Sequence, residues 1–143
     1  MKIHITKLAD HVKIPEYQTA GSVGFDFAAS KEIIIPSRTQ ALVPTGLIIA
    51  TPTNHVLLIT ARSSLFKKKG LILANGVGTI DSDYRGPEDE IFISVFNMLD
   101  TEVRIETGER IAQGLIIPIV KAEFEERTAD GESRGNFGST GDK

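Results

Sequence analysis

Short apolar runs separated by turn residues most constrain the fold of this 143-residue chain. The runs are rich in Ile, Val and Leu, and Gly, Pro or Asn punctuates the sequence between them, which is typical of β-strands. They cover residues 33–35, 41–43, 47–50, 55–61, 91–96 and 111–120. Many short strands at regular spacing predict an all-β sandwich or barrel.

One segment departs from the strand pattern. Residues 63–69 can form a short helix, with Ser63 or Ser64 as the N-cap and Gly70 at the C-terminal end. The sequence shows no internal repeat and no linker, and its length suits one ordinary domain.

The C-terminal residues differ in composition from the rest. Phe137 is the only large apolar residue in 127–143, where glycines alternate with Ser, Thr and charged residues. Such a segment cannot bury enough apolar surface to offset the entropy lost on ordering. We therefore expect an all-β domain over 1–126 and a flexible arm over 127–143. The arm is either a solubilising tail or a cover that closes over a nucleotide.

Composition excludes several classes of protein. The chain has no cysteine, so disulfides and thiolate metal sites are excluded. Its net charge is −3 and Lys67–Lys69 is its one basic stretch, which argues against a broad nucleic-acid footprint. The N-terminus lacks the apolar core of a signal peptide, and no apolar run is long enough to span a bilayer. We expect a cytoplasmic protein that binds neither nucleic acid nor a membrane.

Residues 76–86 form the most informative stretch, Gly-Val-Gly-Thr-Ile-Asp-Ser-Asp-Tyr-Arg-Gly. Its first two glycines allow the backbone to approach a flat base closely. Asp81 can accept a proton from water beside such a ligand. Asp and Gly are also ordinary turn residues, so a simple hairpin accounts for the same letters.

Two further segments contain residue types suited to a ligand. Arg62, Ser63 and Ser64 lie where a strand meets the expected helix, which suits an anion, although a serine cap beside a solvated arginine is the simpler interpretation. Arg110 and Gln113 lie where a turn enters a strand. In a regular pleat they face opposite ways, so they converge on one ligand only if the strand bends.

Asp26 stands among apolar residues in the glycine-containing segment 20–29. Two interpretations are open, a hydrogen-bonded structural acid or a carboxylate that orients water on a metal. The three histidines have no metal-ligand spacing and receive no role.

Five segments together resemble the five motifs of the homotrimeric dUTPases. They are residues 20–29, 61–65, 75–86, 108–113 and 134–141. They occur in the family's order and span nearly the whole chain. The stretch Gly-x-Ile-Asp-Ser-Asp-Tyr-Arg-Gly and the tail Phe-Gly-Ser-Thr-Gly are the most specific parts of the resemblance.

The resemblance implies a jelly-roll-like β-barrel with one short helix, assembled as a homotrimer with shared active sites. The arm of one subunit closes over a site built by the others. The implied reaction is hydrolysis of dUTP to dUMP and pyrophosphate by in-line attack of water at the α-phosphorus. This reaction limits uracil in DNA and supplies dUMP for dTMP synthesis.

The resemblance also implies residue roles around the base and the sugar. Asp81 corresponds to the catalytic aspartate, which holds the attacking water and takes its proton. Tyr84 packs against the deoxyribose and leaves no room for a 2′-hydroxyl group. Asn75 and the backbone around Gly78 read the uracil edge, and Ile80 is a further substrate contact.

The remaining implied substrate contacts hold the phosphates or cover the base. The residues implied to bind phosphates are Arg62, Ser63, Ser64 and Gln113. Arg110 is implied to be a structural residue of the same region. Phe137 stacks on uracil and lies beside Gly138. Arg134, Ser139 and Thr140 hold the outer phosphates.

The implied cofactor is Mg²⁺. This ion prefers octahedral oxygen ligands and keeps several waters, so three phosphate oxygens and water satisfy it without a protein cage. Asp26 corresponds to a family position that anchors a metal-bound water.

Three features depart from the family pattern. Ala61 and Thr107 stand where proline is usual, which loosens the backbone without removing a functional group. Pro87–Glu90 makes a longer acidic turn than expected and should lengthen a hairpin. Arg134 precedes Phe137 by three residues where five are usual, so its role requires a different path of the arm.

Two alternatives stay open at this point. A dCTP deaminase has a related fold and a glutamate on the strand after the hairpin, but alignment through Asn97 places Ser94 there. A nucleotide-sensing trimer scaffold without activity is the second alternative, although the motif residues Asp81, Tyr84 and Arg62 are all present.

Overall fold

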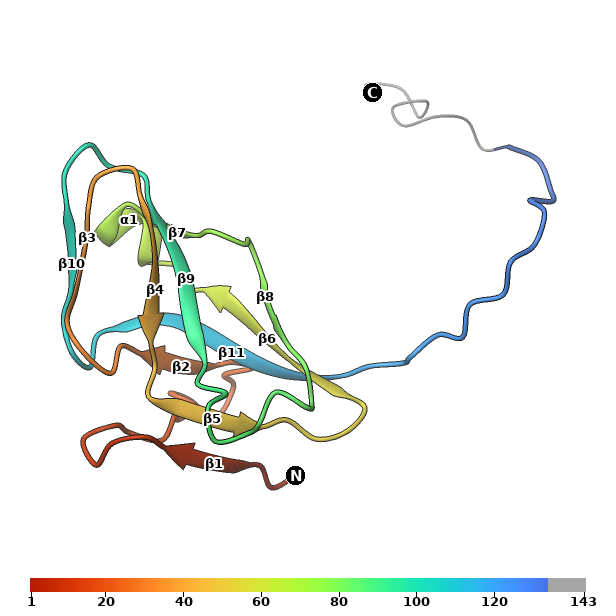
Figure 1. The fold of residues 1–143 in the computed structure, drawn as a ribbon, viewed down its shortest axis with the longest axis horizontal. Helices are drawn as coiled ribbons and strands as arrows, with labels where there is room; N and C mark the ends of the chain where they lie inside the picture. The colour runs from red at the N-terminus through yellow and green to blue at the C-terminus, as the bar shows by residue number, and fades with distance from the viewer. Residues whose placement is uncertain (134–143) are drawn as a thin grey trace.

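The computed structural model describes residues 1–133, and its regular structure is almost entirely β-strand (Figure 1). The single helix of this part of the chain is α1 (Leu65–Lys69). The strands are β1 (His4–Lys7), β2 (Phe25–Ala28), β3 (Ile33–Ile35), β4 (Gln40–Pro44), β5 (Leu47–Ala50), β6 (His55–Ala61), β7 (Leu71–Leu73), β8 (Gly78–Ile80), β9 (Phe92–Asn97), β10 (Val103–Ile105) and β11 (Arg110–Pro118). The prediction of an all-β fold is confirmed.

The strands form antiparallel sheets around one apolar core. The largest sheet has the order β2-β11-β6-β8, a second has β4-β9-β7, and β1-β5 and β10-β3 form pairs. Side chains alternate between the core and the opposite face, as the two-residue period of a strand requires. Phe27 of β2 and Val95 of β9 are fully buried in the same core cluster, whereas Asp26 is only half-buried.

Most of the predicted strands are present with nearly the expected bounds. Residues 33–35, 47–50 and 55–61 coincide with β3, β5 and β6. The last strand was expected over 111–120, but β11 ends at Pro118. Pro118 pairs with His55, the first residue of β6, so the partner strand ends at the same point.

Helix α1 has its N-cap and C-cap residues at the expected positions, but the N-cap side chain does not form the expected hydrogen bond. Ser64 is the N-cap residue, yet its side chain makes no capping hydrogen bond. Gly70 ends the helix in the left-handed region at φ 63°, and its N–H donates to the Phe66 carbonyl at 2.7 Å. Among residues 1–133 no helix is long and apolar enough to cross a membrane.

The expected hairpin around Pro87–Glu90 is wrong. Strand β8 pairs with β6, whereas β9 pairs with β4 and β7. The segment between β8 and β9 therefore crosses from one sheet to the other. Both long edges of β9 are already occupied, which leaves β8 no place beside it.

Beyond β11 the chain leaves the barrel (Figure 1). Residues 121–133 are exposed and contain no helix or strand. They include 127–133, the described part of the expected arm. The boundary at 126/127 stays a prediction.

Gly114 leaves the space that two aromatic rings occupy. It pairs with Phe25 across β11 and β2, and a Cβ atom there would lie 2.7 Å from ring atoms of Phe25 and Phe27. The two rings pack edge to face with centroids 5.4 Å apart. A methyl group at this position must displace at least one of them.

We predict that Gly114→Ala lowers the free energy of unfolding by about 1–3 kcal/mol, the usual cost of overpacking a core. Urea denaturation measures the change. The matched control is Gly21→Ala, because no atom lies within 4 Å of a Cβ built there. Equal stability of the two variants would contradict the packing role of Gly114.

Candidate active site

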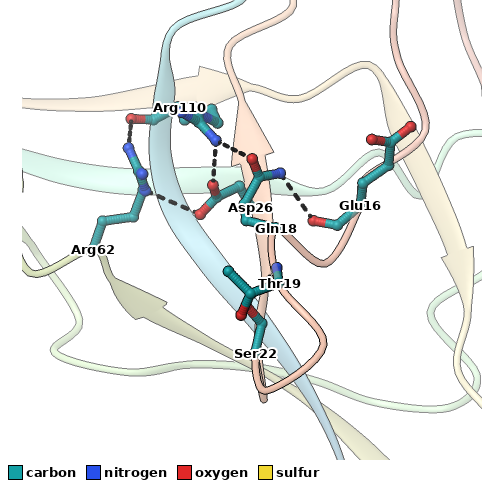
Figure 2. Close-up of polar contacts among 7 residues, drawn as sticks. All are labelled: Glu16, Gln18, Thr19, Ser22, Asp26, Arg62 and Arg110. Atoms are coloured by element: carbon teal, nitrogen blue, oxygen red, sulfur yellow. Dashed lines mark hydrogen bonds and ion pairs between the residues drawn. The ribbon is translucent and has the colours of Figure 1, made fainter.

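Two arginines converge on one carboxylate at the end of the four-stranded sheet (Figure 2). Asp26 Oδ1 accepts from Arg62 Nε at 2.9 Å, and Asp26 Oδ2 accepts from Arg110 Nη1 at 3.0 Å. Arg62 Nη1 also donates to the Arg110 carbonyl at 3.2 Å. The Asp26 side chain is only 12% exposed, so both ion pairs are partly shielded from water. We call these three residues the Asp26 cluster.

A bulge in β11 brings Arg110 to the same face as Asp26. Arg110 pairs with Ala28, but Ala112 pairs with Phe27 and Gln113 with Asp26, so Ile111 is an extra residue in β11. This is the bend that the sequence required for Arg110 and Gln113 to converge. Gln113 therefore lies beside the cluster.

Gln18 completes the surroundings of Arg110, and nothing in the sequence pointed to it. Its Oε1 accepts from Arg110 Nη1 at 2.7 Å, and its Nε2 donates to the Glu16 carbonyl at 3.3 Å. A turn closed by Thr19 and Ser22 follows (Figure 2). A pocket of about 400 Å³ borders Gln18, Asp26 and Arg110.

Ser63 and Ser64 follow Arg62 directly at the start of α1. Ser63 is exposed and Ser64 half-buried. Because Ser64 does not use its hydroxyl as a cap, that group can serve a ligand. Arg62 itself has five N–H donors, and Asp26 and the Arg110 carbonyl leave some of them for an anion.

The second group of predicted site residues lies along β8 and the turns at its two ends. Asn75 is exposed in the turn before β8, and Asp81 is exposed immediately after it. Gly78 pairs with Ile59 and is buried, and a Cβ atom there would approach the Ile59 Cβ to 3.1 Å. Half-buried Ile80 packs against the core.

Strand β8 is the edge of its sheet, since β6 is its single strand neighbour in the sheet order. The outer edge of such a strand presents backbone N–H and C=O groups without a strand partner. A planar base can pair with these groups much as another strand would.

Tyr84 lies in the turn that follows β8. Its hydroxyl donates to the Glu90 carbonyl at 2.9 Å, and its backbone N–H reaches the Asp81 carbonyl at 3.3 Å. The residue is 38% exposed. Tyr84 is thus partly accessible while its hydroxyl group is held by Glu90.

One chain does not bring Asp81 and Arg62 together. Asp81 follows Ile80, which pairs with Leu57 near the start of β6, whereas Arg62 follows the last residue of β6. At roughly 3.3 Å per strand residue, the two lie about 20 Å apart along the strand. Asp81 and Arg62 therefore lie toward opposite ends of β6, whereas Asn75, three residues before Gly78, lies toward the end that carries Arg62.

Asp26 can fill the role predicted for it toward a metal. Among residues 1–133, no group of three or more His, Cys, Asp or Glu could hold a metal ion. A carboxylate has about four acceptor positions, and the two arginines occupy two of them. Asp26 can therefore still accept a hydrogen bond from a metal-bound water.

Five predicted site residues lie outside the described residues. They are Arg134, Phe137, Gly138, Ser139 and Thr140.

Comparison with known proteins identifies the same family along nearly the whole chain. The sequence model of the dUTPase family matches residues 10–141. A deoxyuridine 5′-triphosphate nucleotidohydrolase of Helicobacter pylori strain Shi470 is 40% identical, over 99% of this chain and 97% of that protein. The protein of the same name from Brucella melitensis biotype 2 is 41% identical, over 92% of this chain and 88% of that protein.

Solved structures agree with the fold. The dUTPase of Streptococcus mutans superimposes with a TM-score of 0.80 at 34% identity, over 87% of this chain and 100% of that chain. The dUTPase of Staphylococcus bacteriophage 80alpha gives a TM-score of 0.85 over 98% of both chains, and at 23% identity it supports the fold alone. The predicted jelly-roll-like β-barrel with one short helix is thus confirmed. By sequence and by fold, the chain belongs to the dUTPase family.

Proposed function

We propose that this chain hydrolyses dUTP to dUMP and pyrophosphate by attack of water at the α-phosphorus. The dUTPase family match over residues 10–141 carries the proposal. The convergence of Arg62 and Arg110 on Asp26, beside two serines at a helix start, supports it, because this region can bind a polyphosphate.

Arg62, Ser63, Ser64 and Gln113 bind phosphate oxygens in this proposal. Asp26 holds the Nε atom of Arg62 and the Arg110 carbonyl accepts from its Nη1, so the guanidinium is fixed while its remaining N–H groups can bind the substrate. Charge-assisted N–H bonds of this kind also stabilise the charge that develops on the leaving pyrophosphate.

Asp81 is the proposed general base. Its carboxylate is exposed at the end of β8, where it can hold a water in line with the α-phosphorus and take its proton. Asn75 and the outer edge of β8 at Gly78 read uracil, with Ile80 beside them. Tyr84 packs on the deoxyribose and excludes a 2′-hydroxyl group.

Enzymes of this family generally depend on a metal ion, and we propose Mg²⁺. When bound, Mg²⁺ would offset negative charge on the leaving group. Asp26 would hold the ion indirectly, because its remaining acceptor positions could accept a hydrogen bond from one of the waters that the ion keeps.

We further propose a homotrimer with shared active sites. The separation of Asp81 from Arg62 along β6 supports this assembly, because residues from different chains can meet where those of one chain cannot. The arm of a third chain, with Arg134, Phe137, Gly138, Ser139 and Thr140, closes the site.

No observation favours the deaminase alternative. The position that carries a glutamate in that family is Ser94 on β9, and its hydroxyl oxygen accepts a hydrogen bond from Gln40 Nε2 at 2.8 Å. A hydroxyl group in this position cannot act as the carboxylate acid and base that deamination requires.

We predict that the protein with Mg²⁺ releases pyrophosphate from dUTP far faster than from dCTP, dTTP or UTP. Product analysis by ion-exchange chromatography measures all four reactions. Ammonia from dCTP would favour the deaminase, and no product from any nucleotide would favour the scaffold. Cleavage of UTP as efficient as that of dUTP would remove the sugar-gate role from Tyr84.

We predict that Asp81→Asn lowers kcat for dUTP by about 10²–10⁴-fold, because an amide cannot take the proton from water. Affinity for a nonhydrolysable dUTP analogue, measured by calorimetry, should stay within about threefold of the unmodified protein, since the amide is nearly isosteric. Asp83→Asn is the matched control, two residues further along the same turn. Near-normal turnover by Asp81→Asn would exclude Asp81 as the base.

We predict that Asp26→Ala raises KM for dUTP and lowers the free energy of unfolding by about 1–3 kcal/mol, since two partly shielded arginines lose their acceptor. Steady-state kinetics and urea denaturation measure the two effects. Glu32→Ala removes the ion-pair partner of Arg104, a carboxylate that is 49% exposed, and should cost about 0–1 kcal/mol, with KM unchanged. Equal KM values in the two variants would contradict the role of Asp26 in placing Arg62.

A further inference from the structure

The acidic turn Pro87–Glu90 is docked on the body of the barrel. Asp89 Oδ2 accepts from the Gly86 N–H at 2.6 Å, and Glu90 Oε1 accepts from the Gly46 N–H at 2.7 Å. Two of its three carboxylates therefore bind the protein's own backbone, and Glu88 is the exposed one. This arrangement argues against an acidic surface for a partner.

The point to which Glu90 binds is rigid. Gly46 adopts φ 68°, and a Cβ atom there would lie 2.5 Å from Val12 Cγ2, so both the residue type and the direction of its N–H are fixed. Next to Glu90, the Ile91 N–H donates to the Leu47 carbonyl at 2.9 Å, and buried Thr45 donates its hydroxyl to the Ile91 carbonyl at 2.7 Å.

Glu90 connects this rigid point to Tyr84. The same residue that binds Gly46 through its side chain accepts the Tyr84 hydroxyl through its carbonyl oxygen. Tyr84 is 38% exposed in a turn and no described ring stacks on it, so this bond restrains the ring. Without it, rotation about the side-chain torsions would move the ring away from its position.

We propose that Glu90 is a positioning residue for Tyr84 and thereby sets how strongly the site rejects a ribonucleotide. The proposal rests on the proposed function, in which Tyr84 excludes the 2′-hydroxyl group. A steric gate discriminates only as strongly as it resists displacement, because a loosely held ring moves aside and admits the larger sugar. The hydrogen bonds from Gly46 to Glu90 and from Tyr84 to Glu90 resist displacement of the Tyr84 ring.

The test is the ratio of kcat/KM for dUTP to kcat/KM for UTP. We expect Glu90→Ala to lower this ratio roughly three- to tenfold, the effect of one hydrogen bond on an equilibrium, mainly by raising activity on UTP. Glu90→Gln keeps an acceptor oxygen for the Gly46 N–H and should recover most of the ratio. Glu88→Ala, the exposed neighbour in the same turn, should match the unmodified protein.

A double-mutant cycle separates positioning from general structural support. Tyr84→Phe removes the hydroxyl and should lower the ratio as Glu90→Ala does, but adding Glu90→Ala to Tyr84→Phe should change it by less than about twofold. Three results would overturn the proposal. The effects of the two substitutions on the ratio could multiply in the double mutant, the ratio could be unchanged in Glu90→Ala, or Glu90→Ala could lose the same fraction of its activity on both nucleotides. If Glu90→Ala does not fold, Glu90→Asp is the second variant. Its shorter side chain reaches Gly46 less well, so we expect it to lower the ratio of kcat/KM for dUTP to kcat/KM for UTP as well.

Failure of the proposed function gives a different result. If the unmodified protein releases no pyrophosphate from dUTP, the reaction itself is wrong. If it prefers dUTP and the Glu90 and Tyr84 variants keep the same preference, only the positioning role is wrong.

Discussion

Strand β11 lies between β2 and β6, and its pairing with both strands fixes the half of the candidate site that is proposed to bind phosphates. Its bulge at Ile111 turns Arg110 to the face that Asp26 occupies, and Gln113 then pairs directly with Asp26. On the other side of β11, β6 ends at Ala61, and Arg62 is the first residue of the turn that connects β6 to α1. A shift of this register by one residue would move these side chains to the core face.

The same sheet also keeps Asp81 and Arg62 of one chain apart. Strand β8 lies antiparallel to β6, so the chain that leaves β8 with Asp81 runs away from Arg62. In the proposed function, the outer edge of β8 contacts the base and the partly exposed Tyr84 contacts the sugar. Assembly of several chains is therefore part of the catalytic proposal.

The sequence predicted the elements whose signals are local. Apolar runs bounded by Pro or Gly, such as 33–35 and 47–50, gave the strands, and Gly70 gave the helix end. Strands β7 and β10 have three residues each and depend on their partners, so no local pattern revealed them. The hairpin prediction at Pro87–Glu90 was wrong because which strands pair is decided by the whole sheet.

The candidate site divides in the same way. Family motifs predicted Asp26, Arg62, Gln113 and Asp81 as site residues, but the motifs do not show that Asp26 binds two arginines at once. Gln18 was missed because it contacts Arg110 from 92 positions away, outside any motif. Glu90 looked like part of an insertion, and only its contacts with Gly46 and Tyr84 give it a role.

The two ion pairs of Asp26 have a consequence for the thermodynamics of nucleotide binding. An arginine side chain that is free in water loses up to about 2 kcal/mol of rotamer entropy when it is immobilised. Because Asp26 already holds Arg62 and Arg110, much of that ordering takes place when the protein folds. In the proposed function the two arginines are thus ordered before the phosphates bind, and the negative charge of Asp26 weakens their attraction for phosphate.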